Sequence, residues 1–495
     1  MSKDSKEGQS SVTYGALLTV AMRWIDRLIG LVSTLILARL LVPADFGIIA
    51  MASLVIGLAD VLLDLGVNVA LIQNKKATQA HYNTAWTLRL VQTLVATGIV
   101  AIIAPLASAY FKEPRVAPVI QVLALSFILS GAENIGIIAF QKEMQFSQDF
   151  RFILSKRITG FTVTMIAAWL MQSYWALVIG SLAGRIFGVI LSYAMHPMRP
   201  RPSFEKFREI FAVSQWMLIR SISGYLDNNL HQMIVGRRED ASIMGAYSLA
   251  SEISALPTTE LLAPLNRVLF PAFVKVSHNL TELKRIFLLA QGVQTLIGIP
   301  AGVGLALVAN EAVLLLLGEK WHSAVPLVQI IALVNVMTAI MTSGGYILIT
   351  LGKIRTIVIY SWIQVGMFAT LAFLSIPHGG ALQIAWLRLI VAVVGIVVFI
   401  WLLLRELKGL RLIEIFASVT RPLIGASIMA FSVVNITSIF DLQGKSLLVT
   451  QICVGAVSYS LSIMVLWRLA GCPSGAESYL FEKVAEYRKS GAKHQ

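Results

Sequence analysis

Fourteen long, mostly apolar stretches follow one another along the chain and constrain its fold more than any other feature. An α-helix needs about 20 residues to cross the roughly 30 Å hydrocarbon layer of a membrane. The stretches lack the ten-residue alternation of a β-barrel, so each is predicted to be a membrane-spanning helix. The predicted spans are 13–41, 46–72, 83–110, 117–139, 152–172, 174–195, 210–235, 245–276, 286–309, 326–350, 356–376, 383–404, 423–440 and 447–469. The sequence therefore predicts an all-α polytopic membrane protein with about 14 transmembrane helices.

Composition excludes several other classes of protein. Hydrophobic residues make up 57% of the 495 residues and charged residues 13%, whereas soluble proteins carry about 25% charged residues. A soluble enzyme, a disordered chain and a disulfide scaffold are therefore excluded. The two cysteines, Cys453 and Cys472, form neither a disulfide framework nor a metal site in this pattern.

The distribution of basic residues predicts the orientation in the membrane. The chain has 40 Lys and Arg against 26 Asp and Glu, which gives a formal net charge of +14. With the N-terminus inside, 24 basic residues lie in cytoplasmic segments and 6 in outside loops, as the positive-inside rule requires. Both termini are therefore predicted to be cytoplasmic. Because topology accounts for most of the positive charge, we expect no nucleic-acid partner.

The loops are short, and none is long enough for a catalytic domain. In the first long loop Phe204, Phe207 and Phe211 recur at helical spacing behind Ser203, which predicts a cytoplasmic interfacial helix. A short apolar run at 311–318 is also predicted to lie at the interface. The predicted divisions are a cytoplasmic tail (1–12), an N-lobe of spans 1–6 (13–195), a linker with the interfacial helix (196–209), a C-lobe of spans 7–12 (210–404), a second cytoplasmic linker (405–422), spans 13 and 14 (423–469) and a cytoplasmic tail (470–495).

An internal similarity supports the two lobes. Residues 36–53 align with residues 234–251, and 5 of these 18 positions are identical. Both copies bridge the first and second helices of a six-helix set, so we predict two parallel structural repeats. In transporters built from such repeats the substrate site lies between the two lobes. The alternative is a chance similarity between two apolar hairpins.

Charged residues inside the predicted spans form the candidate site. Ten basic and seven acidic residues lie there, and each costs at least about 2.5–3.5 kcal/mol at the bilayer centre. Five basic residues near the ends of spans are expected to snorkel to the interface: Arg39, Arg89, Lys156, Arg157 and Arg388. The deeper charges concentrate on the first two helices of each proposed repeat, as a central cavity requires.

The excess of deep arginines predicts an anionic ligand that bears phosphate or carboxylate. A guanidinium group matches phosphate oxygens and stays charged. The predicted substrate-binding residues are Arg23, Arg27, Arg185, Arg220 and Arg267. The candidates for coupling to H⁺ or Na⁺, or for charge pairing, are Asp26, Asp60, Asp64, Asp227, His231 and Glu252. Ion pairs that only hold helices together are the alternative for each cluster.

Motifs for catalysis are missing from the sequence. It contains no Walker motif, no glycine-rich phosphate loop, no HExxH and no convincing Ser-His-Asp spacing. We therefore predict no catalytic residues, no metal site and no cofactor beyond a coupling ion, and we expect that the chain is not an enzyme.

Three blocks of sequence resemble a known family. The first is Thr34-Leu-Ile-Leu-Ala-Arg-Leu-Leu-Val-Pro-Ala-Asp-Phe-Gly-Ile-Ile-Ala-Met-Ala, continuing to Ala70-Leu-Ile-Gln. The others are Ala250-Ser-Glu-Ile with Leu269-Phe-Pro-Ala-Phe, and Leu317-Gly-Glu-Lys-Trp-His-Ser-Ala-Val-Pro. These blocks resemble the polysaccharide transporter family, the Wzx-type oligosaccharide flippases of the multidrug/oligosaccharidyl-lipid/polysaccharide (MOP) exporter superfamily.

The resemblance implies a fold and a function. Members of the family have two six-helix lobes in a V around a central cationic cavity, and two C-terminal helices follow. They move undecaprenyl-diphosphate-linked oligosaccharide repeat units from the cytoplasmic to the periplasmic leaflet of the bacterial inner membrane, for exopolysaccharide or lipopolysaccharide biosynthesis. A polysaccharide polymerase and glycosyltransferases are the protein partners this implies. Two alternatives stay open: an ion-coupled drug antiporter of the same superfamily, and a membrane glycosyltransferase or polymerase.

Overall fold

The computed structural model describes most of the chain. It covers residues 24–63, 77–143, 145–207, 215–375, 379–439, 442–473 and 475–479, together with residues 22, 71 and 482. The predicted interfacial helix behind Ser203 lies largely outside the described residues.

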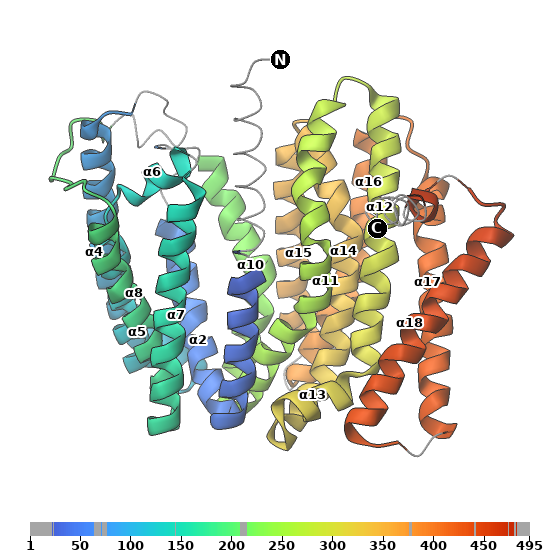
Figure 1. Cartoon of the computed structure of the whole chain (residues 1–495), viewed down its shortest axis with the longest axis horizontal. Helices are drawn as coiled ribbons and strands as arrows, with labels where there is room; N and C mark the ends of the chain where they lie inside the picture. Colours follow the sequence, from blue (N-terminus) through green and yellow to red (C-terminus); the bar gives the residue numbers. More distant parts are fainter. Residues whose placement is uncertain are drawn as a thin grey trace, which may run out of the picture. The chain divides into compact units, whose positions relative to one another are not determined.

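Helices connected by short loops make up the described chain, and no strand occurs in these ranges (Figure 1). Residues 24–40 form the first helix, within predicted span 13–41. The other helices are α2 (Pro43–Leu63), α4 (Gln79–Phe111), α5 (Val116–Ala132), α6 (Ile137–Lys142), α7 (Phe146–Met171), α8 (Trp175–Met195), α10 (Gln215–Arg238), α11 (Ala241–Lys275), α12 (Leu280–Leu307), α13 (Ala309–Leu317), the 3-10 helix η1 (Glu319–Ala324), α14 (Val325–Thr350), α15 (Ile354–Ser375), α16 (Ala381–Glu406), α17 (Leu412–Ile439) and α18 (Gly444–Leu469). Every predicted span coincides with at least one of these helices, which confirms the all-α architecture.

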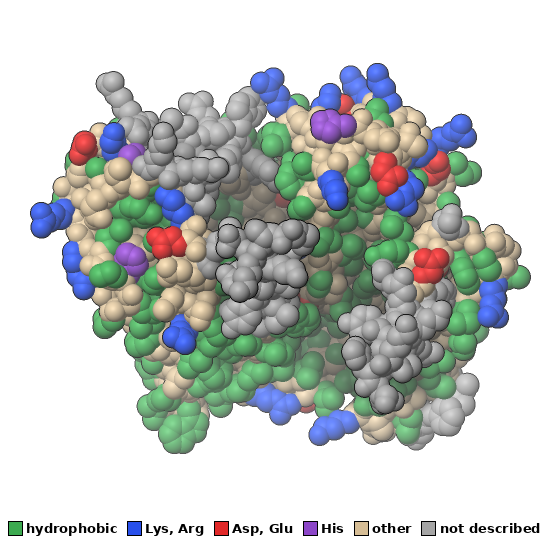
Figure 2. Space-filling model, turned by 45° about the horizontal axis from the view of Figure 1, so that its top comes forward, with side chains coloured by type: hydrophobic (Ala, Val, Ile, Leu, Met, Phe, Trp, Pro, Cys, Tyr) green, Lys and Arg blue, Asp and Glu red, His purple; other side chains and the backbone are tan. Residues whose placement is uncertain are grey.

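Nine helices of the described chain are long and apolar enough to cross a membrane. The described parts of the other five predicted spans are also helical, but residues 24–40 and α5 are shorter, and α7, α10 and α11 carry more polar or charged residues. Large apolar side chains such as Ile102, Trp169 and Phe373 are exposed on helix sides, at 76%, 70% and 83%. Figure 2 shows hydrophobic side chains over much of the visible surface, with Lys and Arg side chains mostly toward the edges of the view. Such an apolar surface is suited to a lipid membrane and not to water.

The fourth predicted span, 117–139, is not one continuous helix, and this prediction was wrong in detail. α5 ends at Ala132, Glu133 takes extended backbone angles (φ −55°, ψ 140°), and α6 begins at Ile137. The Asn134 side chain stabilises the break, because its Oδ1 accepts from the Gly136 N–H at 2.9 Å and its Nδ2 donates to the Met198 carbonyl at 2.7 Å. Asn side chains favour such turns by bonding the nearby backbone.

The structure also defines the helix ends in two predicted segments of the second half of the chain, 311–318 and 405–422. The run at 311–318 forms α13, a nine-residue helix too short to cross. Gly318 ends it with φ 99°, a backbone conformation that favours glycine. α17 begins at Leu412, so residues 412–422 of the predicted second linker are helical.

The chain divides into two compact units, unit 1 (Met1–Gly245) and unit 2 (Ala246–Gln495). In unit 1, α4 packs on α5 and α7 on α8, while α2 contacts α4, α5 and α10. In unit 2, α12 lies against α14 and α17, and α14 against α16. Phe273, Phe287 and Phe399 belong to the core of unit 2. The division between the units falls early in α11, and the lobe boundaries expected from the sequence stay a prediction.

Glycines set the spacing of the α7–α8 pair. A Cβ atom at Gly180 would lie 1.7 Å from Thr164 Oγ1, and one at Gly184 would lie 3.2 Å from the Lys156 carbonyl oxygen. Small residues at intervals of four let helix backbones approach closely within a membrane. The close approach brings the charged residues of α7 next to α8 and to the end of α5.

Candidate functional site

The predicted arginines fall in three groups. Arg23 lies outside the described residues, and so does Asp64 among the acidic candidates. Arg220 is part of α10, but its side chain is outside the described part of the structure. Arg27 and Arg185 lie in unit 1, and Arg267 lies in unit 2.

An ion pair joins the first helix to α7. Arg157 Nε lies 3.0 Å from Asp26 Oδ1, and both side chains are about half exposed, at 48% and 52%. The sequence predicted that Asp26 serves ion coupling or charge pairing and that Arg157 snorkels. The structure pairs these two residues across helices, because Gly30 leaves room for the Arg157 guanidinium beside the first helix. A Cβ atom at Gly30 would lie 3.2 Å from Arg157 Nη2.

A cluster of charges lies between α4, α5, α7 and α8, which we call the Glu133 cluster: Arg89, Glu133, Lys156 and Arg185. Arg89 Nη2 lies 3.6 Å from Glu133 Oε2 and donates to Ser130 Oγ at 3.1 Å. Lys156 Nζ donates to Glu133 Oε1. Arg89 and Lys156, which were expected to snorkel to the interface, therefore both reach a carboxylate between helices, and their position relative to the interface stays a prediction.

The fourth member of the cluster is Arg185, a predicted substrate-binding residue. Its Nη1 donates to the Ser126 carbonyl at 3.4 Å, and its charge repels that of Arg89. Gly188, one turn along α8, leaves room for the lysine: a Cβ atom there would lie 2.8 Å from Lys156 Cδ and 3.1 Å from Glu133 Oε1. Sequence reasoning counted Glu133 among the acids but gave it no role. A role for Glu133 could have been predicted, because it lies near the predicted cytoplasmic end of its span, as Arg89 and Lys156 do.

The predicted coupling residues on α2 and α10 differ in their exposure. Asp60 and Asp227 are exposed. His231 is only 2% exposed, and its Nε2 lies 2.9 Å from the Asn228 carbonyl oxygen. α10 is tied to α2 by the Tyr225 hydroxyl, which donates to the Leu54 carbonyl at 2.6 Å.

In unit 2 the predicted residues lie on α11. Glu252 and Arg267 are both exposed, and Arg267 forms no ion pair among the residues that the structure describes. Beside it, Asn266 Oδ1 accepts from Gln294 Nε2 at 2.9 Å. Gln294, fully buried, and Gln291 extend this polar contact to Ser343 on α14.

The sequence did not predict this uncharged network, because only the charged residues in the spans were considered as candidates. Two glutamines in an otherwise apolar span were the available signal. Buried polar groups are kept when they are hydrogen-bonded, so the network positions α11, and with it Arg267, against α12 and α14.

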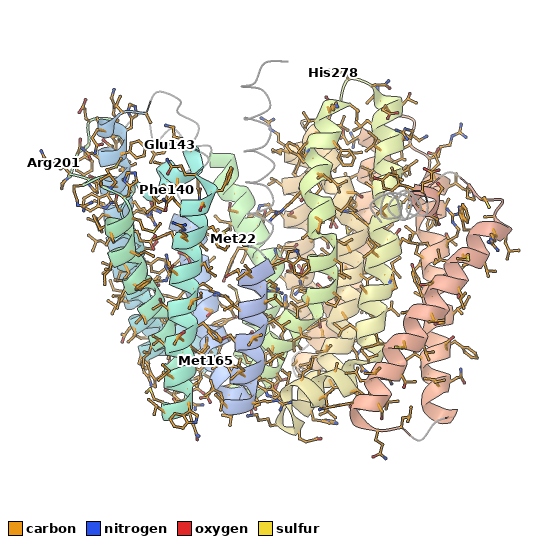
Figure 3. The ribbon with its side chains drawn as sticks, in the orientation of Figure 1. Met22, Phe140, Glu143, Met165, Arg201 and His278 are labelled. Atoms are coloured by element: carbon orange, nitrogen blue, oxygen red, sulfur yellow. The ribbon has the colours of Figure 1, made fainter. Side chains whose placement is uncertain are left out.

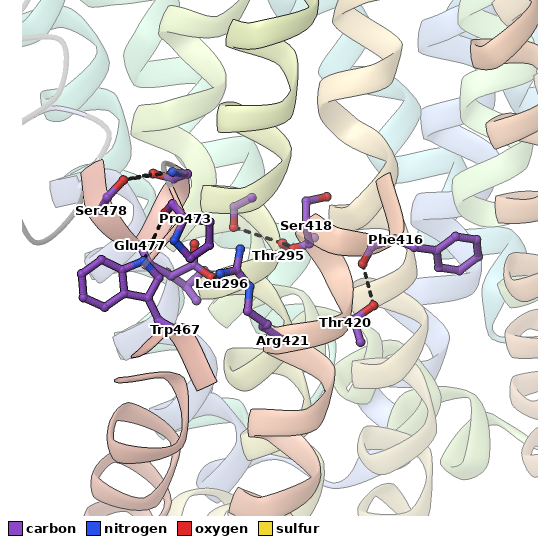
Figure 4. A network of polar contacts seen from close by, with 12 residues as sticks. Thr295, Leu296, Phe416, Ser418, Thr420, Arg421, Trp467, Pro473, Glu477 and Ser478 are labelled. Atoms are coloured by element: carbon purple, nitrogen blue, oxygen red, sulfur yellow. Dashed lines mark hydrogen bonds and ion pairs between the residues drawn. The ribbon is translucent and has the colours of Figure 1, made fainter. Parts of the chain in front are cut away.

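A second ion pair in unit 2 fastens the chain after α18. Arg421 Nε on α17 lies 3.2 Å from Glu477 Oε1, with side-chain exposures of 21% and 5%. Trp467 Nε1 donates to the Pro473 carbonyl at 3.2 Å, as Figure 4 shows. The sequence placed Arg421 in a cytoplasmic linker, whereas it lies within α17.

The described charged side chains can bind an anion or pair with one another between helices. Within the described ranges no group of three or more His, Cys, Asp or Glu could hold a metal ion. Among the charged residues inside the helices, Arg89, Lys156 and Arg157 contact carboxylates, and Arg185 contacts a backbone carbonyl. Such groups suit an anionic ligand or ion pairing between helices.

Comparisons with known proteins give a consistent result. A family model described as "Polysaccharide biosynthesis protein" matches residues 36–326. The chain is 25% identical over 404 residues to the lipopolysaccharide biosynthesis protein WzxC of Escherichia coli (strain K12), covering 81% of each chain. It is 24% identical over 444 residues to the succinoglycan biosynthesis transport protein ExoT of Rhizobium meliloti (strain 1021), covering 88% of each.

The fold is that of a solved transporter. The structure of the lipid II flippase MurJ in an inward closed conformation aligns with a TM-score of 0.74 at 14% identity, over 92% of this chain and 99% of that one. This similarity confirms a polytopic helical membrane fold.

Proposed function

Because the chain belongs to the family of polysaccharide biosynthesis proteins, we propose that it is a flippase for undecaprenyl-diphosphate-linked oligosaccharide repeat units. It would move them from the cytoplasmic to the periplasmic leaflet by alternating access, for exopolysaccharide or lipopolysaccharide biosynthesis. It would act as a transporter and not as an enzyme. The family match over more than half of the chain is the observation that carries this proposal.

Two independent features support it. Both relatives are named for polysaccharide biosynthesis and one for transport, and the fold is shared with a lipid II flippase. We place this multi-pass helical protein in the inner membrane of a bacterium, with both termini in the cytoplasm as the positive-inside rule predicts. A polysaccharide polymerase and glycosyltransferases would be its partners in the pathway.

The diphosphate is assigned to the deep arginines: Arg23, Arg27, Arg185, Arg220 and Arg267. Arginine binds phosphate oxygens through two parallel N–H donors and keeps its charge at depth. The exposure of Arg267 supports this assignment, because an exposed guanidinium on a membrane helix is available to a ligand. The oligosaccharide would travel with the diphosphate, and the polyprenyl chain would remain in the bilayer.

Coupling to H⁺ or Na⁺ is assigned to acidic residues and a histidine that also lie inside predicted spans: Asp26, Asp60, Asp64, Asp227, His231 and Glu252. A carboxylate that releases a cation changes the charge around the diphosphate, which would drive release.

Transport in reconstituted vesicles tests the proposal. We expect purified protein to carry a lipid-linked oligosaccharide to the opposite leaflet, measured by the access of a membrane-impermeant lectin. A variant with Arg27→Gln and Arg267→Gln should transport at least about tenfold more slowly, since a hydrogen bond to a charged group contributes about 1.5–3 kcal/mol. Arg285→Gln is the matched control, because Arg285 forms an exposed pair with Glu282 on its own helix.

Each outcome has a separate meaning. Transport by the double variant at the rate of the control would refute the arginine assignment. No oligosaccharide transport by the unsubstituted protein would refute the function, and transport of ethidium instead would establish the drug antiporter.

A further inference from the structure

We propose that the Glu133 cluster is a second anion-binding site, which shares Arg185 with the deep arginines and receives the diphosphate of the lipid-linked substrate before it reaches Arg23, Arg27, Arg220 and Arg267. Glu133 acts there as an internal counter-ion that the diphosphate replaces. The inference rests on the proposed function for the identity of the ligand, but the site itself is argued from the structure of unit 1.

The geometry is that of a preformed site. Two cations from different helices, Arg89 on α4 and Lys156 on α7, converge on the two oxygens of one carboxylate. Their side chains are 20% and 30% exposed, and Glu133 is 13% exposed. The groups are therefore mostly removed from solvent, yet each cation keeps an accessible edge.

The charges in the cluster do not balance. Arg89, Lys156 and Arg185 contribute three positive charges, and among the described residues Glu133 is the one acidic partner of this set. A cation within a membrane is stabilised by an anion or by backbone carbonyls, and here Arg185 contacts a carbonyl while Arg89 and Lys156 share one carboxylate. A diphosphate diester carries one negative charge on each phosphoryl group, so when it replaces Glu133 it balances more of the three positive charges than the single carboxylate does.

The chemistry of the donors also fits. Arg89 presents a planar fork suited to two phosphate oxygens, whereas Lys156 supplies a mobile point charge. The hydroxyl of Ser130, which accepts from Arg89, can donate to a further phosphate oxygen. When the ligand is absent, Glu133 holds both cations in place, so less side-chain ordering remains for binding to require.

The backbone allows the carboxylate to leave. Glu133 follows the last residue of α5 and has extended backbone angles, so no continuous helix fixes its side chain from both sides. Gly188 on α8 provides the space in which the lysine and the carboxylate meet. A side chain at this position would fill the site.

The position along the helix places the site on the entry side. Lys156 is the eleventh residue of α7, which begins at Phe146, so it lies about 15 Å from the start of that helix. Figure 3 shows Phe140 and Glu143 near the end where α7 begins and Met165 toward the opposite end. In the predicted topology α7 begins in the cytoplasm, where the substrate is made.

Binding of inorganic pyrophosphate to the full chain tests the site. Protein in phosphatidylcholine nanodiscs is titrated with pyrophosphate in a calorimeter. Lys156→Gln and Arg89→Gln should each weaken binding at least tenfold, Arg89→Lys should lose part of the affinity, and Glu133→Gln should tighten binding. Lys353→Gln is the matched control, because Lys353 forms a balanced pair with Glu406 in unit 2, with a nitrogen–oxygen distance of 3.0 Å.

Further arms separate the sources of failure. Unchanged pyrophosphate affinity in Lys156→Gln and Arg89→Gln, with unchanged melting temperatures, overturns the site while oligosaccharide transport by the unsubstituted protein still upholds the function. Weakened binding in both variants without any oligosaccharide transport upholds an anion site and refutes the flippase. Loss of pyrophosphate binding when phosphatidylglycerol is added to the nanodiscs overturns the proposal in favour of a phospholipid headgroup site.

Discussion

Two glycines decide how closely helices meet in unit 1. A Cβ atom at Gly47 would lie 1.7 Å from the Ala241 carbonyl oxygen, and one at Gly245 would lie 1.9 Å from the Pro43 carbonyl oxygen. These glycines are the aligned pair of the proposed internal repeat. The beginnings of α2 and α11 therefore cross with their backbones in contact, which any side chain would prevent.

Substitution of Gly47 tests this crossing. Gly47→Ala should destabilise the protein by about 1–3 kcal/mol, because the obstacle is backbone that cannot move aside. Gly98→Ala on α4 is the control, since no described atom lies within 4 Å of a Cβ there; alanine should be neutral or stabilising by up to about 1 kcal/mol. Thermal unfolding of the purified variants measures both, and equal melting temperatures would contradict the crossing.

A histidine after α8 gives the predicted cytoplasmic end of unit 1 a dependence on pH. Burial lowers the pKa of the His196 imidazole below its usual 6.5, the charge of Glu143 raises it and that of Arg199 lowers it further. The neutral ring is favoured for a second reason: its Nδ1 accepts from the Met198 N–H at 3.2 Å. Protonation at Nδ1 would break this hydrogen bond.

The sign of the pH effect follows. A lowered pKa in the folded state means that the unfolded state binds more protons, so stability is complete above about pH 6.5 and is lost as the pH falls through the folded-state value. We expect the melting temperature to fall between about pH 7 and pH 5. His196→Gln should flatten this slope. A slope unchanged in that variant would assign the pH dependence to other groups.

At the scale of elements, the segment after α18 is held by α12 and α17. A Cβ atom at Gly292 on α12 would lie 2.8 Å from Ala476 Cβ, and Glu477 pairs with Arg421 on α17. Gly292 on α12 and Arg421 on α17 thus hold residues 475–479 against these two helices. This arrangement explains why a charged residue lies well within α17.

Removal of the carboxylate should release the segment. Glu477→Gln leaves Arg421 without its ionic partner and should cost about 2 kcal/mol, the magnitude of a hydrogen bond between charged groups. Limited proteolysis should then cut after α18 sooner, and the melting temperature should fall. Glu282→Gln removes a carboxylate from a fully exposed pair and should change neither. Identical digestion of the two variants would show that the ion pair does not hold the segment.

At the scale of the whole molecule, two divisions of the chain predict different motions. The lobes inferred from the sequence separate α4 from α10, whereas unit 1 includes both. Arg237 on α10 donates to the Tyr110 carbonyl on α4 at 2.6 Å and lies 4.9 Å from the Tyr110 ring centre. Alternating access between two six-helix lobes requires that this contact open.

Cross-linking identifies the moving body. Tyr110→Cys and Arg237→Cys are introduced after Cys453 and Cys472, which are exposed, are replaced by serine. A short bismaleimide between the new cysteines should abolish oligosaccharide transport, and each single cysteine treated in the same way is the control. Full transport by the cross-linked protein would mean that unit 1 moves as one body.

Part of the candidate site was predictable from the sequence and part was not. The membrane cost of charge identified the arginines and acids that need partners, so Asp26, Arg157 and Glu133 were all recognised as residues inside spans. Their pairing was not predictable. Arg89 and Lys156 lie near span ends, where snorkelling satisfies a charge as well as an internal carboxylate does.

The sequence by itself determined the helices, because a membrane permits no other way to satisfy the backbone of so many apolar stretches. It also determined the family, through blocks that survive at low overall identity. Only the tertiary structure decided which charges meet, where the fourth span breaks and at which glycines the helices pack closely. Those outcomes depend on how far side chains extend toward neighbouring helices. The spacing of residues along one helix does not predict these contacts.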